Sequence, residues 1–400
     1  MIEIKEIDVS KERRFISRYI TFLLLGLYQV SYGLYIRLYY RLRSQNKDVL
    51  PKKGPYLLLA NHCNNFDGLF LQCLIKRPVC FVVTDAMFKK KILGKLMEFV
   101  GFIPKRKLVT DSKAIRQIIR TIRQGGIVGI FPESGRNWDG KTGPISPATY
   151  RLAQLLGVPV VTACIKGAYL SEPRWADTKR RGLVDVCFQV HFGNRAKPSL
   201  EDIERSVSAA LSHNEAIWQK QKKIAFEGKA LSKGYERLLF ICPTCKRIGT
   251  MDSSDERIRC MACGAAYRLD TYGFVHAING ELPADNSPEL NDWQLRLLSS
   301  RFFNADPDII LMSDEGANLY SASSKKQPFE LVEAGSLSLK KKKMMIGQRI
   351  FDISQMHGIS VYFKSALEFR YKGLDYRIGF NETRVSAYKW NCALEAIKEQ

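Results

Sequence analysis

Short apolar runs alternate with helical patterns through the first half of the chain. Each apolar run is bounded by turn residues and predicts a buried strand, over residues 56–60, 80–84, 127–131, 158–165 and 184–192. Capping residues and glycines predict helices between these runs, over residues 113–123, 146–157 and 198–225. The alternation therefore predicts an α/β domain over residues 46–235, with a mixed sheet flanked by helices.

The stretch before this domain is the most lipid-like part of the chain. Residues 19–36 carry no charge, and arginines and tyrosines stand on both sides of them, as at a bilayer interface. This core of 18 residues is short of the ~20 that a spanning helix needs. We expect residues 1–45 to form a helical segment that lies in the membrane surface. The alternative is a buried amphipathic helix. A cleavable signal peptide is not expected, because acidic residues occupy the start.

The last part of the chain, residues 276–400, has the pattern of a small antiparallel β domain. Its short alternating segments are followed by a helical pattern over residues 384–398, with Trp390 and Leu394 expected to face a core. Several strands closed by one helix are similar to a pleckstrin-homology-like barrel. That analogy concerns the fold and implies no particular ligand.

Four of the ten cysteines form two CxxC units, Cys242 with Cys245 and Cys260 with Cys263. Four thiolates at this spacing are typical of a structural Zn²⁺ site without an open position for water. We expect a zinc ribbon over residues 236–275. A redox pair of CxxC motifs is the competing interpretation. The other cysteines are scattered, which favours a reducing compartment over a disulfide framework.

The formal charge of +22 is unevenly distributed. Residues 1–200 carry 34 Lys and Arg against 14 Asp and Glu, whereas residues 201–400 carry 28 against 26. A basic surface of this size favours an anionic partner such as nucleic acid, an anionic membrane or a phosphate-bearing substrate. The excess lies away from the predicted ribbon and close to a lipid-like stretch, so nucleic acid is the less favoured partner.

The first candidate for chemistry follows the strand at residues 56–60. His62 stands just after this strand, and Asp67 follows five residues later, beyond the turn-prone Asn64 and Asn65. A turn there would bring the carboxylate to one ring nitrogen and leave the other to accept a proton from a hydroxyl group. By itself the pair is weak evidence, because a capped turn explains it equally well.

Three further segments follow at characteristic intervals: Gly101-Phe102-Ile103-Pro104-Lys105-Arg106, Phe131-Pro132-Glu133-Ser134-Gly135-Arg136 and Gly157-Val158-Pro159-Val160-Val161. With the His62 segment they resemble the glycerolipid acyltransferase family, whose blocks are approximately NHxxxxD, GxIxxxR, FPEGTRS and VPV. The third block departs from this pattern. Ser134 stands where the family usually has glycine, and Gly135 where it has threonine. This departure at Ser134 and Gly135 bears on which acceptor the enzyme would use.

The resemblance implies a membrane-associated enzyme of phospholipid biosynthesis that moves a fatty acyl group from acyl-CoA or acyl-carrier protein to a lysophospholipid, most simply 1-acylglycerol 3-phosphate. It implies that His62 and Asp67 are catalytic. The residues that would hold the phosphate and glycerol of the acceptor are Lys105, Arg106, Glu133, Ser134, Gly135 and Arg136. Guanidinium groups suit phosphate oxygens, and Glu133 would bond a hydroxyl or order Arg136.

Two rival functions stay open at this point. The first keeps the enzyme class and changes the acceptor to glycerol 3-phosphate or another lysophospholipid. The second is a basic zinc-ribbon protein that binds lipid or nucleic acid without catalysis. For the enzyme, we expect a peripheral or monotopic protein on the cytoplasmic face of a membrane.

Overall fold

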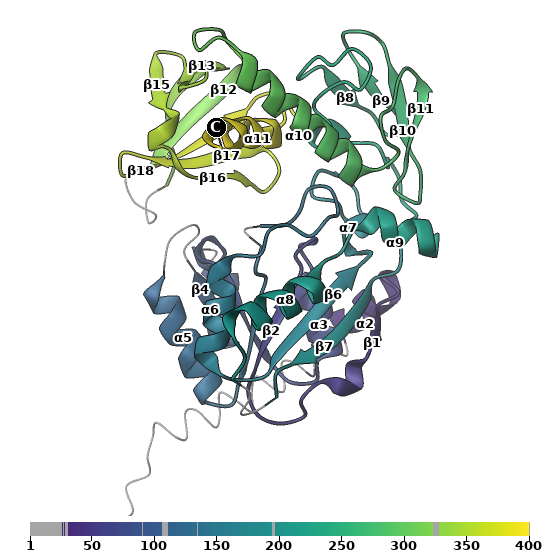
Figure 1. The fold of residues 1–400 in the computed structure, drawn as a ribbon, viewed down its shortest axis with the longest axis vertical. Helices are drawn as coiled ribbons and strands as arrows, with labels where there is room; N and C mark the ends of the chain where they lie inside the picture. The colour runs from purple at the N-terminus through teal and green to yellow at the C-terminus, as the bar shows by residue number, and fades with distance from the viewer. Residues whose placement is uncertain are drawn as a thin grey trace, which may run out of the picture. The chain divides into compact units, whose positions relative to one another are not determined.

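The computed structural model describes residues 26, 28, 31–89, 91–105, 111–133, 135–193, 197–322 and 328–399. The chain forms two compact units (Figure 1). The N-terminal unit consists of Met1–Asn137, Thr142–Ser171 and Arg181–His213, and the C-terminal unit of Trp138–Lys141, Glu172–Arg180 and Asn214–Gln400. Two short internal segments therefore leave the first unit, join the second and return.

A seven-stranded sheet forms the centre of the N-terminal unit. Its order is β1-β7-β6-β2-β5-β3-β4. The strands are β1 (Arg43–Gln45), β2 (Tyr56–Ala60), β3 (Val79–Thr84), β4 (Ile103–Lys105), β5 (Ile127–Ile130), β6 (Val160–Lys166) and β7 (Asp185–His191). The β7–β6 pair is antiparallel and the other pairs are parallel. The predicted mixed α/β sheet is confirmed.

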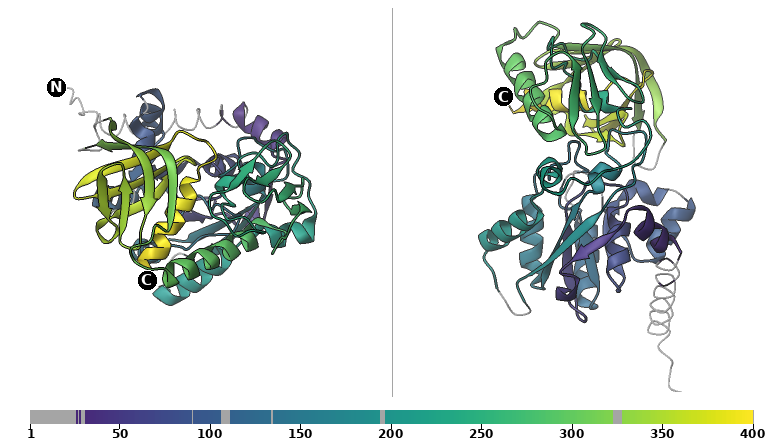
Figure 2. Two further views of the ribbon diagram at one scale, coloured as in Figure 1. Left: turned by 90° about the horizontal axis from the view of Figure 1, so that it is seen from above. Right: turned by 90° about the vertical axis from the view of Figure 1, so that its right-hand side faces the viewer.

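Helices cover both faces of this sheet, which lies between them in the right-hand view of Figure 2. Their bounds are α2 (Tyr32–Tyr39), α3 (Asp67–Leu74), α4 (Lys91–Phe99), α5 (Ser112–Arg123), α6 (Pro147–Leu156), α7 (Ala168–Ser171) and α8 (Leu200–Leu211), with 3-10 turns at Lys47–Val49 and Asp85–Lys89. Leu57 and Leu59 of β2 pack in one core with apolar residues of α5, α6 and α8. Aromatic contact between Tyr40 and Phe70 joins the chain after α2 to α3.

The helix ends show how local chemistry sets these bounds. Helix α5 begins where the Asp111 side chain accepts hydrogen bonds from the backbone N–H groups of Lys113 and Ala114. Helix α6 begins at Pro147 and ends at Leu156, and the next residue, Gly157, has a left-handed φ of 59°. The prediction of one helix over residues 198–225 is wrong. This segment forms two helices, because after α8 the Asn214 side chain caps a second helix, α9 (Glu215–Lys222).

After α9, the C-terminal unit contains a four-stranded antiparallel sheet of order β11-β10-β9-β8. Its strands are β8 (Met251–Ser253), β9 (Ile258–Cys260), β10 (Ala266–Leu269) and β11 (Val275–Asn279), preceded by a 3-10 turn at Tyr235–Arg237. Helix α10 (Ser287–Asn304) follows, inside the region that was predicted to form a small antiparallel β domain. Asn286 caps this helix and Pro288 occupies its first turn.

A second seven-stranded sheet completes the C-terminal unit, and Figure 1 shows α11 (Ala387–Lys398) against it. Its strands are β12 (Met312–Ala322), β13 (Glu330–Leu339), β14 (Lys343–Ile346), β15 (Arg349–Asp352), β16 (His357–Tyr362), β17 (Ala366–Tyr371) and β18 (Leu374–Phe380), with a 3-10 turn at Ile353–Gln355. All its pairs are antiparallel, in the order β15-β14-β13-β12-β18-β17-β16. Trp390 and Leu394 are buried, as predicted. The predicted antiparallel β region closed by a helix is confirmed.

Most of the predicted membrane segment, residues 1–45, lies outside the described residues. Its described part contains α2, which exposes Tyr32, Leu34, Tyr35 and Leu38. Within the ranges that the structure describes, no helix combines the length and the apolar character needed to cross a bilayer.

Candidate functional site

The site is built at the carboxyl end of β2, in the middle of the N-terminal sheet. Asn61 follows this strand and is fixed by two hydrogen bonds. Its Oδ1 accepts from the N–H of Ile165 at 2.7 Å, and its Nδ2 donates to the carbonyl of the same residue at 2.9 Å. These bonds tie the start of the His62 loop to the end of β6. Carboxyl ends of parallel strands are where open α/β sheets place ligand-binding residues.

Asp67 turns back onto His62 from the first position of α3. Its Oδ2 lies 2.8 Å from His62 Nδ1 and accepts the backbone N–H groups of Cys63 and Asn64, both at 2.8 Å. The carboxylate is fully buried, whereas the His62 side chain is 26% exposed. The turn needs no left-handed residue at Asn64 or Asn65. With Nδ1–H donating to Asp67, Nε2 is the nitrogen that can accept a proton.

Two residues that follow β5 support the His62 ring and backbone. The Phe131 ring stacks on the imidazole, with 4.5 Å between centroids and 24° between planes. Glu133 is 8% exposed and uses both carboxylate oxygens on backbone groups. Its Oε1 accepts from the N–H of His62 at 2.6 Å, and its Oε2 from the N–H of Gly143 at 2.7 Å. Glu133 therefore holds the backbone of His62 directly.

Three of the other residues that were predicted to bind the acceptor are described by the structure, and two are not. Lys105 is exposed at the end of the edge strand β4, and Gly135 and Arg136 are half-buried after β5. Arg106 and Ser134 lie outside the described residues. Among the described residues, the structure thus brings His62, Asp67 and Glu133 into one hydrogen-bonded group.

Sequence reasoning overlooked three contributors to this group. The first is Phe131, which the sequence showed only as part of a motif. In the structure its ring stacks on the imidazole of His62. The backbone N–H of Asn137 donates to the carbonyl of His62 at 2.9 Å, and Gly143 donates to Glu133. Backbone donors leave no trace in residue type. Cys63 is buried, and its Sγ lies 3.7 Å from Asp67 Oδ1.

Residues 41–166 match the Acyltransferase family model. These residues contain all four segments that carried the family resemblance, the His62 segment among them. The match covers less than half of the chain and leaves the C-terminal unit outside it. It supports the glycerolipid acyltransferase resemblance for the N-terminal unit.

Curated relatives point in the same direction. The chain is 24% identical over 183 residues to the chloroplastic 1-acyl-sn-glycerol-3-phosphate acyltransferase BAT2 of Brassica napus, covering 44% of this chain and 52% of that protein. It is 30% identical over 146 residues to a probable 1-acyl-sn-glycerol-3-phosphate acyltransferase of Mycoplasma genitalium, covering 35% and 53%. The chain therefore spans about half the length of these relatives.

A solved structure is also similar. The crystal structure of the 1-acyl-sn-glycerophosphate acyltransferase PlsC from Thermotoga maritima aligns with 50% of this chain and 95% of its own chain. The two share 17% sequence identity at a TM-score of 0.38.

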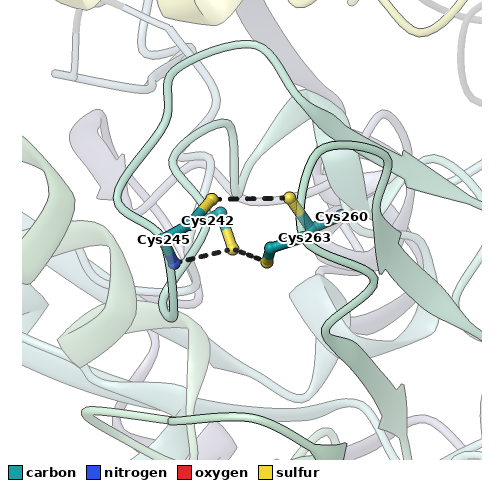
Figure 3. Close-up of side chains that lie close together, drawn as sticks. All are labelled: Cys242, Cys245, Cys260 and Cys263. Atoms are coloured by element: carbon teal, nitrogen blue, oxygen red, sulfur yellow. Dashed lines mark hydrogen bonds between the residues drawn. The ribbon is translucent and has the colours of Figure 1, made fainter.

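The second candidate site is a cluster of four thiols in the C-terminal unit (Figure 3). The Sγ atoms of Cys242, Cys245, Cys260 and Cys263 all lie within 4.8 Å of one another. Two separations are 3.7 Å, from Cys242 to Cys263 and from Cys245 to Cys260. Tetrahedral Zn²⁺ with Zn–S bonds of ~2.3 Å places sulfurs about 3.8 Å apart, so the observed spacing fits a metal.

The four thiols differ in pKa, and a metal would have to displace the proton of those whose pKa is raised. Burial alone would raise the pKa of Cys260, but hydrogen bonds from the Thr250 hydroxyl and from the backbone of Ala262 and Cys263 lower it to about 6. Burial raises the pKa of Cys242 to about 12. Several thiolates this close to one another need a positive ion to offset their repulsion. The cluster can therefore hold a metal with four sulfur ligands.

Proposed function

We propose that this protein is a 1-acylglycerol-3-phosphate acyltransferase. It would transfer a fatty acyl group from acyl-CoA or acyl-carrier protein to a lysophospholipid, giving phosphatidic acid when the acceptor is 1-acylglycerol 3-phosphate. The observation that carries this proposal is the pairing of His62 Nδ1 with the buried Asp67 carboxylate, within a segment that matches the Acyltransferase family model.

His62 acts in this proposal as the general base. Its Nε2 takes the proton of the acceptor hydroxyl while the hydroxyl oxygen attacks the thioester carbonyl. The tetrahedral intermediate then collapses, its C–S bond breaks, and the imidazolium returns the proton to the departing thiolate. Asp67 holds the Nδ1–H and stabilises the imidazolium as it forms. No covalent acyl-enzyme is required.

The acceptor is held by the basic residues of the second and third segments. We assign its phosphate to Arg106 and Arg136 with help from Lys105, because guanidinium groups bind phosphate oxygens in pairs. Ser134 and Gly135 would line the glycerol. For Glu133 the contacts to His62 and Gly143 support a positioning role beside the acceptor-binding role that the resemblance implies.

Membrane attachment is proposed through the segment at residues 1–45. The exposed apolar and aromatic side chains of α2, together with Arg37 and Arg41, suit the surface of an anionic bilayer. We place the enzyme peripherally, on the cytoplasmic face of a membrane, where both a lysophospholipid and a soluble thioester are accessible.

The C-terminal unit is proposed to contain a structural zinc ribbon followed by a pleckstrin-homology-like domain. The 3.7 Å sulfur spacing supports Zn²⁺ at Cys242, Cys245, Cys260 and Cys263. With four sulfur ligands the metal has no open position for water, so it would stabilise the fold and take no part in the reaction. The strand order and the terminal helix α11 support the second assignment.

The test is acceptor-dependent release of thiol from palmitoyl-CoA by the full chain. Release with 1-acylglycerol 3-phosphate, lowered about 10²–10⁴-fold by His62→Ala, is the expected result. Parallel reactions with glycerol 3-phosphate and with other lysophospholipids identify the acceptor. Absence of release with every acceptor, from both acyl-CoA and acyl-carrier protein, would instead favour a lipid-binding protein without catalysis.

A further inference from the structure

We infer that Phe131 is a positioning residue for the acyl-transfer reaction. Its ring holds the plane of the His62 imidazole and favours the imidazolium that forms when His62 takes a proton. The inference rests on the proposed function, in which His62 is the general base. Every residue that carries it belongs to one segment of the N-terminal unit, Met1–Asn137.

The hydrogen bonds of His62 restrain the tilt of its ring only weakly. Glu133 accepts the backbone N–H at 2.6 Å, Asn137 donates to the backbone carbonyl at 2.9 Å, and Asp67 holds Nδ1 at 2.8 Å. The torsion that turns an imidazole plane has broad minima, and a single hydrogen bond at Nδ1 tolerates a range of tilts. Because Nε2 shifts as the ring tilts, a contact to the face of the ring is needed to fix it.

Phe131 supplies that contact. Its ring stacks on the imidazole, with 4.5 Å between centroids and 24° between planes. The sheet brings the two residues together, because β2 and β5 are parallel neighbours with Leu59 opposite Ile130. His62 and Phe131 follow these strands at the same edge of the sheet. The stacking is therefore a consequence of the strand register.

Phe81 supports the Phe131 ring from the other side. Phe81 lies on β3, is 3% exposed and stacks on Phe131 with 5.9 Å between centroids and 9° between planes. Phe102 meets the Phe81 ring edge-on at 5.8 Å. Gly129 of β5 pairs with Phe81, and a Cβ there would lie 2.5 Å from a carbon of the Phe81 ring. We call the three rings of His62, Phe131 and Phe81 the aromatic stack. Its buried end is closely packed, so Phe131 cannot withdraw from the imidazole.

The aromatic stack lies on one face of the sheet, opposite the core formed with α5, α6 and α8. Val128, which precedes Gly129, packs in that core. Successive residues of a strand point to opposite faces, so Gly129 and its partner Phe81 point away from it. A Cβ at Gly68 of α3 would lie 3.7 Å from the Phe81 ring, in ordinary contact. Substitutions in the α5–α6–α8 core therefore leave the aromatic stack untouched and can serve as controls.

The stacking geometry also has an electrostatic consequence. The face of an aromatic ring attracts a cation that lies within ~6 Å of its centroid. The His62 ring, at 4.5 Å, is neutral when it accepts the proton and positively charged afterwards. The attraction is therefore stronger in the transition state than in the ground state, and interactions of this kind raise kcat. The expected contribution is about 2–30-fold in rate.

A merely structural role predicts a different result. If Phe131 only fills apolar space, leucine should replace it with a change in melting temperature and almost none in kcat. If the ring face positions His62, leucine should lower kcat and tyrosine should restore it. The KM for the thioester should change little in either case, because no substrate-binding group is removed.

The experiment compares five full-length proteins by kcat, KM for palmitoyl-CoA and melting temperature. They are the unmodified chain and the variants Phe131→Leu, Phe131→Tyr, Phe81→Leu and Ile118→Val. Ile118 of α5 is the control, because it is buried in the core on the other face of the sheet. A second measurement, which needs no activity, records the NMR signals of the His62 ring protons in histidine-labelled protein, assigned by their loss in His62→Ala. The ring current of an aromatic face shifts protons held above it upfield.

We expect Phe131→Leu to lower kcat by about 10–100-fold with KM within about twofold, because both orientation and electrostatic attraction are lost. Phe131→Tyr should remain within about threefold of the unmodified chain, and Phe81→Leu should lower kcat by about 3–10-fold. Ile118→Val should lower the melting temperature and leave kcat within about twofold. The His62 ring signals should move downfield in Phe131→Leu and return in Phe131→Tyr.

Equal kcat in the Phe131→Leu and Ile118→Val proteins would overturn the inference, and so would His62 ring signals that do not move. If Phe131→Leu does not fold, unchanged kcat and unmoved signals in Phe81→Leu overturn it. These outcomes leave the proposed function standing, since the unmodified chain is active in each of them. An unmodified chain without thiol release would instead overturn the proposed function and, with it, the kinetic role of Phe131.

Discussion

The two hydrogen bonds of Glu133 allow a quantitative prediction. The carboxylate is 8% exposed and accepts the N–H groups of His62 and Gly143 at 2.6 and 2.7 Å. A hydrogen bond to a charged group contributes about 1.5–3 kcal/mol. In Glu133→Gln the side chain keeps one acceptor oxygen, and its NH₂ group faces a backbone donor. The N-terminal unit should lose about 2–4 kcal/mol of unfolding free energy.

The kinetic effect follows from the partner of the lost bond. Since one of the two donors is the backbone of the proposed base, we expect kcat to fall by about 10²-fold, with the acceptor KM nearly unchanged. The assay combines thiol release at several acceptor concentrations with urea unfolding. Glu215→Gln is the matched control, because it places glutamine at a buried glutamate of α9 in the other unit.

The opposite kinetic pattern would refute this reasoning. An acceptor KM raised about tenfold or more, with the unfolding free energy and kcat unchanged, would mean that Glu133 binds the acceptor and does not position His62. The sequence resemblance implies that binding role, so the experiment separates the two roles of Glu133 directly.

Three further predictions address the base, the metal and pH. Asp67→Asn should lower kcat by about 10²–10⁴-fold, because the amide cannot both hold the His62 tautomer and stabilise the imidazolium; wild-type kcat would contradict this. The purified chain should contain one Zn²⁺ by atomic absorption, and Cys260→Ser or a chelator should remove it and lower the melting temperature of the C-terminal unit; a metal-free chain with unchanged melting would exclude the site. Burial lowers the pKa of His191 below its usual 6.5, so the folded protein binds fewer protons there than the unfolded chain. Stability from His191 is present above pH 6.5 and is lost as pH falls below it, by at most about 1.4 kcal/mol per pH unit. Urea titrations at several pH values should show this slope, and His191→Gln, which can still pair with Thr162, should reduce it.

Local patterns in the sequence determined much of this protein. The apolar run Tyr56–Ala60 predicts a central strand, because five consecutive buried residues need cover on both faces of a sheet. The two CxxC units predict a thiol cluster, because each pair is brought together by its own tight turn. The His62–Asp67 pairing also follows from a short loop, since only four residues separate the two.

The helix α10 shows where local pattern fails. Its first turn is rich in polar residues and contains Pro288, which resembles a linker in the sequence. Tertiary contact reverses that interpretation, because Leu290, Leu298 and Phe302 are buried in the core of the C-terminal unit. The hydrogen bonds of Asn291 and Gln294 are satisfied by residues far away in the chain, which no local window contains.

The support of the His62 loop, in contrast, depends on contacts between residues that are far apart in the sequence. Glu133, which accepts the backbone N–H of His62, lies 71 positions from it in the sequence. The residue type at Glu133 is compatible with substrate binding, with a surface ion pair or with a structural role in the core. The choice among these depends on which distant backbone groups need a partner once the sheet has formed. Local sequence patterns were therefore sufficient to predict the strands, the thiol cluster and the His62–Asp67 pair, whereas the contacts that hold His62 in place form only in the folded chain.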